Sequence, residues 1–305
     1  MTCDLLGPTG RDERKSAAVD TALLGRLVPG DHVCWLVDDD DTRADGTAVY
    51  VDAGLTRNHK VMYCGDDPAG VLAGLEARGV PTGPALATGQ LQLSTAEDVY
   101  LASGAFAPEA TLKSWRLESV KARAEGYRGL RAFGDMSWAG RDASQADRVP
   151  WYEDQVNRVV ADGFAIGLCL YDRRLFSLSR LSDFTSAHPG VLSAGNSGGP
   201  VPLFHVVRTA DPVGLRLRGE ADLSSRRALR TVLAHLMDDL DAAGRELTFD
   251  VSGLQFADGH TARLLADAAR NARAVRIVGC TPALTRLLAF HGAGTRPGLT
   301  VEAAR

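Results

Sequence analysis

Six side chains that could bind a ligand lie at or near the ends of apolar runs of strand length. These residues are His32, Cys34, Asp135, Trp138, Tyr171 and Asp172. Open parallel sheets place their binding crevices at the carboxyl ends of the strands, so we predict that the six residues line one crevice. Tryptophan and tyrosine offer apolar area with one polar handle, which suits a small organic ligand. Asp172 has a simpler alternative role, in an ion pair with Arg173 at the strand exit.

A metal site is the alternative chemistry for part of this set. His32 and Cys34 alternate with Val33, so both side chains point to one face of their strand. With Cys169 and His188 they could form a Cys₂His₂ site. No compact ligand pair of known metal spacing supports that arrangement, and a buried free cysteine usually packs as a small hydrophobic side chain. We therefore expect no metal and no cofactor, and keep the Cys₂His₂ site as the alternative.

A second polar group lies in the last third of the chain. The segment LTFDVSGLQFADGHTARLL leads from an apolar strand through a polar turn to Asp258, Gly259, His260 and Thr261, and then into a helical run. A helix N-terminus has free backbone N–H groups and a positive dipole end, so it can accommodate a phosphate. We predict that these four residues form a docking surface for a protein partner. His260 is ionisable near neutral pH, although a plain polar position at the helix start explains it as well.

Two short motifs resemble catalytic loops but lack the partners that the chemistry needs. Residues 195–200, GNSGGP, resemble the loop around a trypsin-like nucleophile, but that chemistry needs a base and an acid on β-barrels. Residues 7–16 contain the glycines, lysine and serine of a phosphate loop at the wrong spacing. No Gly-x-x-x-x-Gly-Lys-Ser/Thr motif occurs in the sequence. We therefore expect a protein that is not an enzyme.

Composition restricts the class of partner and the compartment. The formal net charge of −4 and the short basic clusters argue against direct nucleic-acid binding. The five cysteines are odd in number and widely spaced, which favours a reducing compartment over a disulfide framework. The first residues are too polar for a secretory signal, and no run approaches the ~20 apolar residues that cross a membrane. We expect a cytoplasmic protein without membrane contact.

Strand-like and helix-like runs alternate along the whole chain, which predicts an α/β fold. In the first part, the sequence predicts a mainly parallel sheet with helices on both faces. The expected strands there are residues 32–37, 60–64, 91–93, 130–133 and 164–171, and the later ones are 213–219, 245–250 and 275–279. The expected helices include residues 108–125, 156–161, 178–187, 223–243, 261–272 and 282–290. The stretch GVLSAGNSGGPVP lacks periodicity, which is typical of a linker.

Residues 203–302 resemble the STAS family of anti-sigma-factor antagonists. The resemblance rests on the LRGEAD turn at 217–222, the DVSGL stretch at 250–254, Asp258, and the Val278–Gly279 segment with Pro282 and Leu287. The family usually reads Asp-Ser-Ser-Gly from Asp258 onward, and its first serine accepts phosphate. This chain has Gly259 at that position and a hydroxyl only at Thr261. The resemblance implies docking to an anti-sigma factor without the usual serine phosphorylation, with phosphorylation of Thr261 as the alternative.

Residues 20–192 resemble the MEDS family, a sensory domain of methanogens and methylotrophs. The matching blocks are GDHVCW at 30–35, GQL at 89–91, DVYL at 98–101, EGYRGLR at 125–131, GDMSW at 134–138 and CLYDRR at 169–174. The resemblance implies a RecA- or KaiC-related fold that senses small organic ligands. It divides the chain into a flexible N-terminus (1–19), a sensory domain (20–192), a linker (193–202) and a STAS-like domain (203–305).

Together these features predict a signalling protein that acts on transcription, in which the sensor biases the docking surface of the output domain. Such a signal requires a ligand that binds two arrangements of the domains with different affinity. The alternative is a scaffold that senses nothing and assembles complexes through its STAS-like face. A crevice filled by its own side chains would favour the scaffold.

Overall fold

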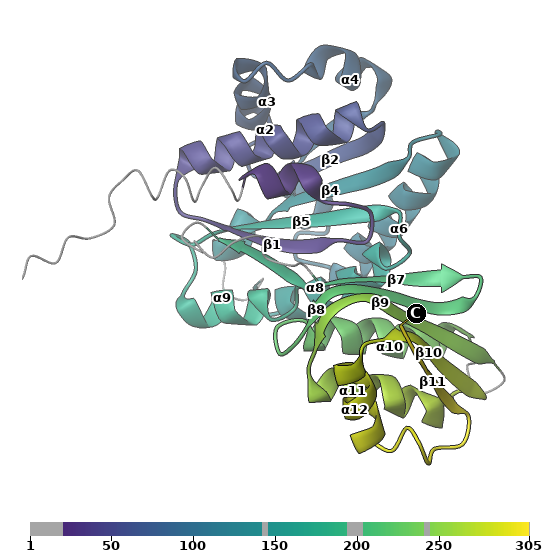
Figure 1. The fold of residues 1–305 in the computed structure, drawn as a ribbon. Coiled ribbons are helices and arrows are strands. Elements are labelled where there is room, and N and C mark those ends of the chain that lie inside the picture. Colours follow the sequence, from purple (N-terminus) through teal and green to yellow (C-terminus); the bar gives the residue numbers. More distant parts are fainter. Residues whose placement is uncertain (1–20, 142–145, 194–203, 241–244, 305) are drawn as a thin grey trace, which may run out of the picture.

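The computed structural model describes residues 21–141, 146–193, 204–240 and 245–304. The predicted flexible N-terminus and nearly all of the predicted linker lie outside these residues, as does the GNSGGP motif. No helix among the described residues is long and apolar enough to cross a membrane. Two sheets form the framework, and helices lie between them and around them (Figure 1).

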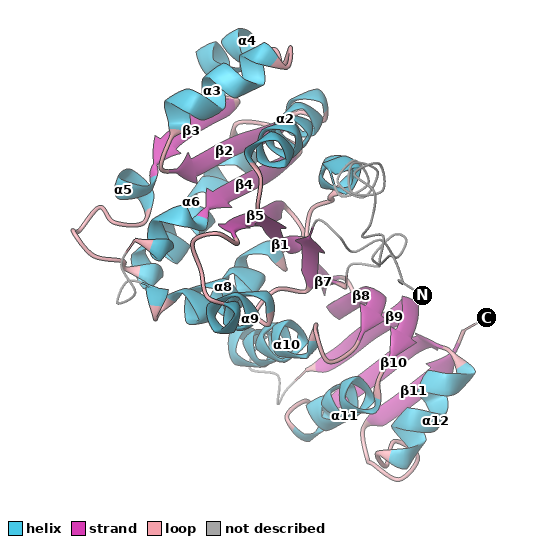
Figure 2. Ribbon diagram, turned by 90° about the vertical axis from the view of Figure 1, so that its left-hand side faces the viewer, coloured by secondary structure: helices cyan, strands magenta, loops and turns pink. Residues whose placement is uncertain are grey.

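Six parallel strands form the N-terminal sheet, in the order β3-β2-β4-β5-β1-β6. The strands are β1 (His32–Val37), β2 (His59–Gly65), β3 (Leu91–Thr95), β4 (Gly129–Asp135), β5 (Ala165–Asp172) and β6 (Gly190–Ser193). One face carries α2 (Asp40–Thr56), α3 (Pro68–Ala77) and α4 (Thr82–Thr88), and the other carries α6 (Pro108–Ala124), α8 (Val149–Val160) and α9 (Leu178–Thr185) (Figures 1 and 2). Two short helices, α5 (Ala96–Val99) and the 3₁₀ helix η1 (Met136–Gly140), follow β3 and β4. All eight residues of β5 are buried, as expected for a central strand with helices on both faces.

The C-terminal sheet has five strands in the order β11-β10-β9-β8-β7. The strands are β7 (His205–Ala210), β8 (Val213–Ala221), β9 (Glu246–Ala257), β10 (Ala274–Cys280) and β11 (Leu299–Ala303). The helices are α10 (Arg226–Leu240), α11 (Gly259–Asp267), the 3₁₀ helix η3 (Ala268–Arg270) and α12 (Pro282–Phe290). Only the pair β7–β8 is antiparallel. In β8 the side chains of Leu215 and Leu217 enter the core while those of Arg216 and Arg218 are exposed, which is the period-two pattern of a half-buried strand.

The predicted fold class is confirmed, and several predicted boundaries differ from the structure, three of which are described here. Helix α8 begins at Val149, because Pro150 suits the first turn of a helix. Strand β9 continues to Ala257 through the expected turn at 252–253. It remains paired with β8 there because the register between the two strands shifts along this stretch. Strand β6 occupies the beginning of the expected linker stretch, including Ser193, and pairs with β1.

A buried arginine ties β4 to the helices above it. Arg131 is fully buried, and its guanidinium donates hydrogen bonds to the carbonyl oxygens of Leu24, Leu27 and Tyr50 at 3.0–3.4 Å. Its Nε also lies 3.4 Å from Nδ1 of His59, which accepts the hydrogen bond. A buried charge is costly unless hydrogen bonds satisfy it, so these contacts hold the N-terminal segment against the sheet.

The His59–Arg131 pair makes stability depend on pH. Burial, followed by repulsion from Arg131, lowers the pKa of His59 from 6.5 to about 4. The unfolded chain therefore binds a proton that the folded chain does not between these two values. The contribution of neutral His59 to the free energy of unfolding is fully present above about pH 6.5. It is lost as the pH falls towards 4.

We expect the free energy of unfolding to fall between pH 7 and pH 5, with His59 contributing up to about 1.4 kcal/mol per pH unit. The substitution His59→Asn keeps an acceptor for Arg131 but removes the titrating group. The variant should therefore show a shallower pH dependence in urea unfolding followed by circular dichroism. An unchanged slope in the variant would show that His59 is not the source.

Candidate functional site

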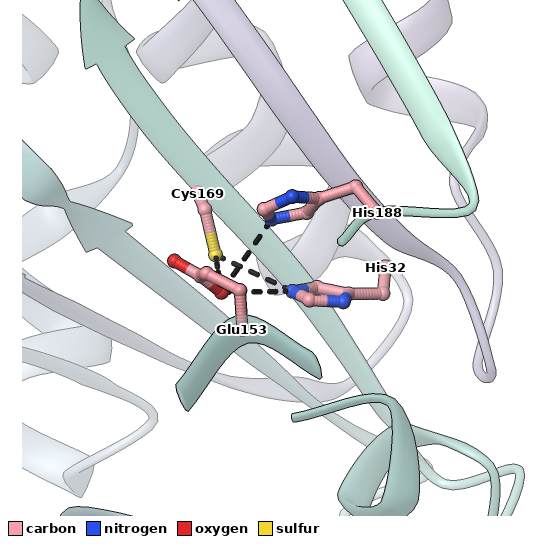
Figure 3. Close-up of side chains that lie close together, drawn as sticks. All are labelled: His32, Glu153, Cys169 and His188. Atoms are coloured by element: carbon pink, nitrogen blue, oxygen red, sulfur yellow. Dashed lines mark hydrogen bonds and ion pairs between the residues drawn. The ribbon is translucent and has the colours of Figure 1, made fainter. Parts of the chain in front are cut away.

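Four side chains converge in the interior of the N-terminal domain (Figure 3). They are His32 on β1, Glu153 on α8, Cys169 on β5, and His188 in the turn between α9 and β6. One atom from each lies within 4.8 Å of the corresponding atom of every other residue. All four residues are buried. We call this group the His-Glu-Cys-His cluster.

The Oε2 atom of Glu153 lies close to the ligand atom of each of the other three residues in the His-Glu-Cys-His cluster. It is 3.2 Å from Sγ of Cys169, 3.3 Å from Nε2 of His32 and 3.5 Å from Nε2 of His188. The distance between Cys169 Sγ and His32 Nε2 is 3.5 Å. The imidazole rings of the two histidines lie beside each other with centroids 4.2 Å apart.

Hydrogen bonds outside the cluster fix the tautomers of both histidines. Nδ1 of His188 lies 2.8 Å from the carbonyl oxygen of Phe184, which can only accept, so this nitrogen carries the proton. The amide nitrogen of Asn157 donates to backbone carbonyls, including that of Ala187 at 2.8 Å. Its Oδ1 therefore faces Nδ1 of His32 at 3.1 Å and accepts the proton there. In the neutral form of each imidazole, Nε2 therefore presents a lone pair towards the interior of the cluster.

The pKa shifts of the cluster follow from burial and from its internal contacts. Burial would raise the pKa of Glu153, but His188 and His32 outweigh that effect and hold it below its usual range. Burial and the proximity of His188 lower the pKa of His32. Burial and the Glu153 charge raise the pKa of the Cys169 thiol well above its usual range. These shifts favour a carboxylate at Glu153, a neutral imidazole at His32 and a protonated thiol at Cys169.

A second layer of contacts orients the carboxylate. The hydroxyl of Tyr171 donates a hydrogen bond to the other oxygen of Glu153, Oε1, at 2.5 Å. The ring of Tyr171 stacks on Phe184 at a centroid distance of 4.6 Å. Packing of Tyr171 therefore fixes the rotamer of Glu153 through its Oε1 oxygen.

The structure distributes the six predicted ligand residues among three places. His32 and Tyr171 belong to the His-Glu-Cys-His cluster or contact it, and Cys34 is paired with Cys169 in the register of β1 and β5. Asp135 and Asp172 both pair with Arg43, at the carboxyl ends of β4 and β5. The ion pair expected between Asp172 and Arg173 is replaced by one between Asp172 and Arg174, at 2.6 Å.

Trp138 lies apart from the other predicted ligand residues, in an aromatic group with Tyr100, Phe106 and Tyr152. Its indole ring stacks on Tyr100 at a centroid distance of 5.1 Å. Its indole N–H is buried and has no hydrogen-bond partner in the described part of the chain. All six predicted residues are at most 3% exposed.

An open pocket of about 310 Å³ lies between α2 and α3, at the carboxyl ends of β2 and β4. Its polar lining comes from Asp40, Arg43, Tyr63, Asp67 and Asp135. The volume falls in the range of small-molecule sites. Only Asp135 of the six predicted residues lines this pocket.

Sequence reasoning missed Glu153 and Asn157. The helix predicted at 156–161 was too short to include the carboxylate. With the helix extended to Val149, its apolar face reads Val149, Tyr152, Val156 and Val160, and Glu153 lies within that face. An acid on the buried face of an amphipathic helix is an informative signal, because such a group needs partners in the interior.

Helix α8 connects the cluster to the C-terminal domain. Glu153 faces the cluster, and the next residue, Asp154, faces α10. Oδ1 of Asp154 accepts a hydrogen bond from Thr231 at 2.9 Å and lies 3.4 Å from Nε of Arg227. Figure 2 shows α8 and α10 side by side between the two sheets.

Strand β1 makes a second connection between the domains. Asp31 precedes His32 and forms an ion pair with His205 on β7 at 2.9 Å. Gly30 has φ of 102°, and a Cβ at this position would lie 2.4 Å from Val207. The β7 strand therefore packs directly on the start of β1, where only glycine fits.

The predicted docking residues lie at the start of α11. Asp258 is the N-cap, and its Oδ1 accepts a hydrogen bond from the backbone N–H of Thr261 at 2.7 Å. Its Oδ2 lies 3.0 Å from Arg226 at the start of α10. Gly259 and His260 are partly exposed, whereas Thr261 is 1% exposed and its hydroxyl donates to the carbonyl of Ala221.

The fold and the sites define a two-domain α/β protein, and comparisons with known proteins identify its families. The family model "MEthanogen/methylotroph, DcmR Sensory domain" (MEDS) matches residues 31–189, more than half of the chain, which therefore belongs to the MEDS family. The model "Mlab, STAS domain" matches residues 204–300. The predicted order of a MEDS domain followed by a STAS domain is confirmed.

Solved structures give only distant likenesses. The flagellar accessory protein FlaH from Methanocaldococcus jannaschii is 12% identical with a TM-score of 0.41, over 66% of this chain and 83% of FlaH. The DUF1998 helicase MrfA, bound to DNA and AMPPNP, is 9% identical with a TM-score of 0.36, over 94% of this chain and 41% of the helicase. A search of curated proteins found no match.

We expect Asp258→Ala to lower the free energy of unfolding by about 1 kcal/mol, because it removes the N-cap of α11. Asp258→Asn keeps an oxygen for the cap and should cost less. Urea unfolding of the two variants beside the parent protein measures the difference. Equal losses in both variants would assign the effect to the Arg226 ion pair instead.

Proposed function

We propose that this chain is a cytosolic signalling protein that regulates transcription. Its MEDS domain senses a small organic ligand and controls partner docking by the STAS domain. The partner is an anti-sigma factor, and docking proceeds without serine phosphorylation. The membership of both families supports a signalling role, and the finer assignments rest on the contacts described below.

A short path of contacts between the two sites carries the proposal. Glu153 in the cluster adjoins Asp154, which lies 3.4 Å from Arg227 of α10. Arg227 adjoins Arg226, which lies 3.0 Å from Asp258 at the docking turn. A displacement of α8 would therefore act on the start of α10 and on the cap of α11. Two arrangements of this helix pair, with different ligand affinity, would constitute the signal.

The docking surface has features of a protein interface. Phe256, at the end of β9, is 51% exposed, and it lines a groove of about 180 Å³ with residues of α12. The partly exposed Gly259 and His260 follow Phe256 within the next four residues of the chain. Exposed aromatic side chains are enriched at protein interfaces.

The chemistry of the turn supports docking without phosphorylation. Gly259 has no hydroxyl, and the one hydroxyl of the turn, on Thr261, is buried and hydrogen-bonded. A kinase would have to unfold the start of α11 to reach it. We also propose that the chain is not an enzyme, since neither the cluster nor the open pocket joins a nucleophile to a base beside accessible space.

The second candidate function is a scaffold that assembles complexes without sensing a ligand. The burial of all six predicted ligand residues favours it. The open pocket beside Arg43 and Asp135 favours a sensor instead.

A thermal-shift screen with small organic compounds separates the sensor from the scaffold, because a ligand at a hundred times its Kd stabilises the folded protein by about 2.7 kcal/mol. The substitution Arg43→Ala should abolish the shift if the ligand occupies this pocket.

We expect the Gly259→Ser variant to gain one phosphate per chain when it is incubated with an anti-sigma-factor kinase. The parent protein and Gly259→Ala should gain none. A serine fits at this position, because a Cβ added to Gly259 would meet no atom closer than Nε2 of His291, at 3.8 Å. Phosphosite mapping by mass spectrometry provides the measurement, and a phosphate on Thr261 of the parent protein would contradict the proposal.

We expect the full chain to bind an anti-sigma factor, and Gly259→Asp to weaken that binding about tenfold. A negative charge at the docking turn imitates part of the effect of a phosphate. Gly259→Ala is the matched control and should bind like the parent protein. Isothermal titration calorimetry against a panel of purified anti-sigma factors tests this. Failure of every member to bind would leave the scaffold as the better account.

A further inference from the structure

We propose that His32, Glu153, Cys169 and His188 bind one divalent transition-metal ion, with zinc as the best match. The ligand atoms are Nε2 of each histidine, Oε2 of the glutamate and Sγ of the cysteine. This inference rests on the geometry of the His-Glu-Cys-His cluster and stands independently of the proposed signalling role. The ligand set differs from the Cys₂His₂ alternative of the sequence, because Glu153 replaces Cys34.

Four of the six distances between ligand atoms of the cluster match the edges of a tetrahedral site. Zinc binds imidazole nitrogen, carboxylate oxygen and thiolate sulfur at about 2.0–2.3 Å, so the edges of the coordination tetrahedron are about 3.3–3.6 Å. The four distances given by the structure run from 3.2 Å (Cys169 Sγ to Glu153 Oε2) to 3.5 Å (His188 Nε2 to Glu153 Oε2). The other two pairs of ligand atoms lie within 4.8 Å, so a metal ion among the four groups would draw the more distant side chains inward.

The hydrogen-bonding state of His188 is the second observation that points to a cation. Its Nε2 is fully buried and has no hydrogen-bond partner in the described part of the chain, yet it faces Oε2 of Glu153. Its proton is held on Nδ1 by the Phe184 carbonyl. A lone pair that faces a carboxylate in the interior is unfavourable unless a proton or a metal ion lies between them. His32 presents its Nε2 lone pair to the same point.

The surroundings of the cluster are those of a metal site. Metal-binding histidines commonly donate their other N–H to a carbonyl or carboxamide oxygen, as His188 and His32 do with Phe184 and Asn157. Tyr171 supplies the matching hydrogen bond to the carboxylate. Four protein ligands in a closed tetrahedron are typical of structural zinc, whereas catalytic zinc keeps an open position. Soft sulfur and imidazole together select against magnesium and calcium.

Binding involves a simple exchange of a proton for the metal. The S–H bond of Cys169 breaks, its proton leaves to solvent, and the thiolate forms the S–Zn bond. The histidines bind as neutral imidazoles through Nε2, and Glu153 binds as a carboxylate. No change of oxidation state is involved.

The test uses the full chain, produced in medium with zinc and freed of loosely bound metal by gel filtration. We expect about one zinc ion per chain by plasma mass spectrometry. Cys169→Ser and Glu153→Gln should each lose most of it. Cys34→Ser is the matched control, because Cys34 is an equally buried thiol on the neighbouring strand, and it should retain the metal. Loss in Cys34→Ser with retention in Glu153→Gln would overturn this ligand set.

Cobalt provides a test that does not depend on the folding of ligand variants. The parent protein loaded with Co(II) should show the intense visible bands of tetrahedral cobalt and a sulfur-to-cobalt charge-transfer band. The Tyr171→Phe variant keeps all four ligands and should bind zinc about tenfold to a hundredfold more weakly in chelator competition. A parent protein that takes up no stoichiometric metal, or cobalt spectra without the sulfur band, would overturn the proposal.

Discussion

The burial of one carboxylate constrains how the helices and strands of the N-terminal domain can pack. Glu153 is fully buried on α8, and a charged group in the interior is tolerated only when its oxygens are satisfied. Cys169 and Tyr171, both on β5, donate hydrogen bonds to its two oxygens, and His32 on β1 and His188 before β6 enclose Oε2. The depth and rotation of α8 on the sheet are therefore fixed. Helix α8 also carries Asp154, which contacts α10. By fixing α8, the carboxylate of Glu153 therefore also fixes the position at which α10 can pack.

The sequence predicted most of the framework, because the framework follows from hydrophobic periodicity. Runs such as FAIGLCLY are apolar throughout, and a parallel strand buried on both faces requires that pattern. The boundaries that differ are those where pairing between distant segments overrides local composition. The sequence of β6 resembles a linker. It forms a strand because it pairs with the free edge of β1. The turn expected at 252–253 remains extended because β8 pairs along it.

The candidate site was harder to predict than the fold. His32, Cys169 and His188 were identified as possible ligands, yet their actual companion is Glu153, which lies on a helix and not on a strand. A search at the carboxyl ends of predicted strands finds only residues of the sheet and its loops. It cannot find a ligand that comes from a helix packed on the face of the sheet. The predicted crevice residues divide among three places for the same reason. Side-chain direction and the path of the connecting helices decide which of them meet.

The start of α11 suggests where control of docking must come from under the proposed function. Asp258 caps the helix and pairs with Arg226, and neither contact needs a serine at position 259. The backbone of a phosphorylation turn is therefore present without the hydroxyl that would accept phosphate. A domain that cannot receive a charge at its own surface needs its input from another element. Helix α10 is that element, because its adjacent residues Arg226 and Arg227 contact the docking turn and α8 respectively. Under the proposed function, the glycine at position 259 and the packing of α8 on α10 have one explanation, in which the attached domain supplies the control that a kinase would otherwise supply.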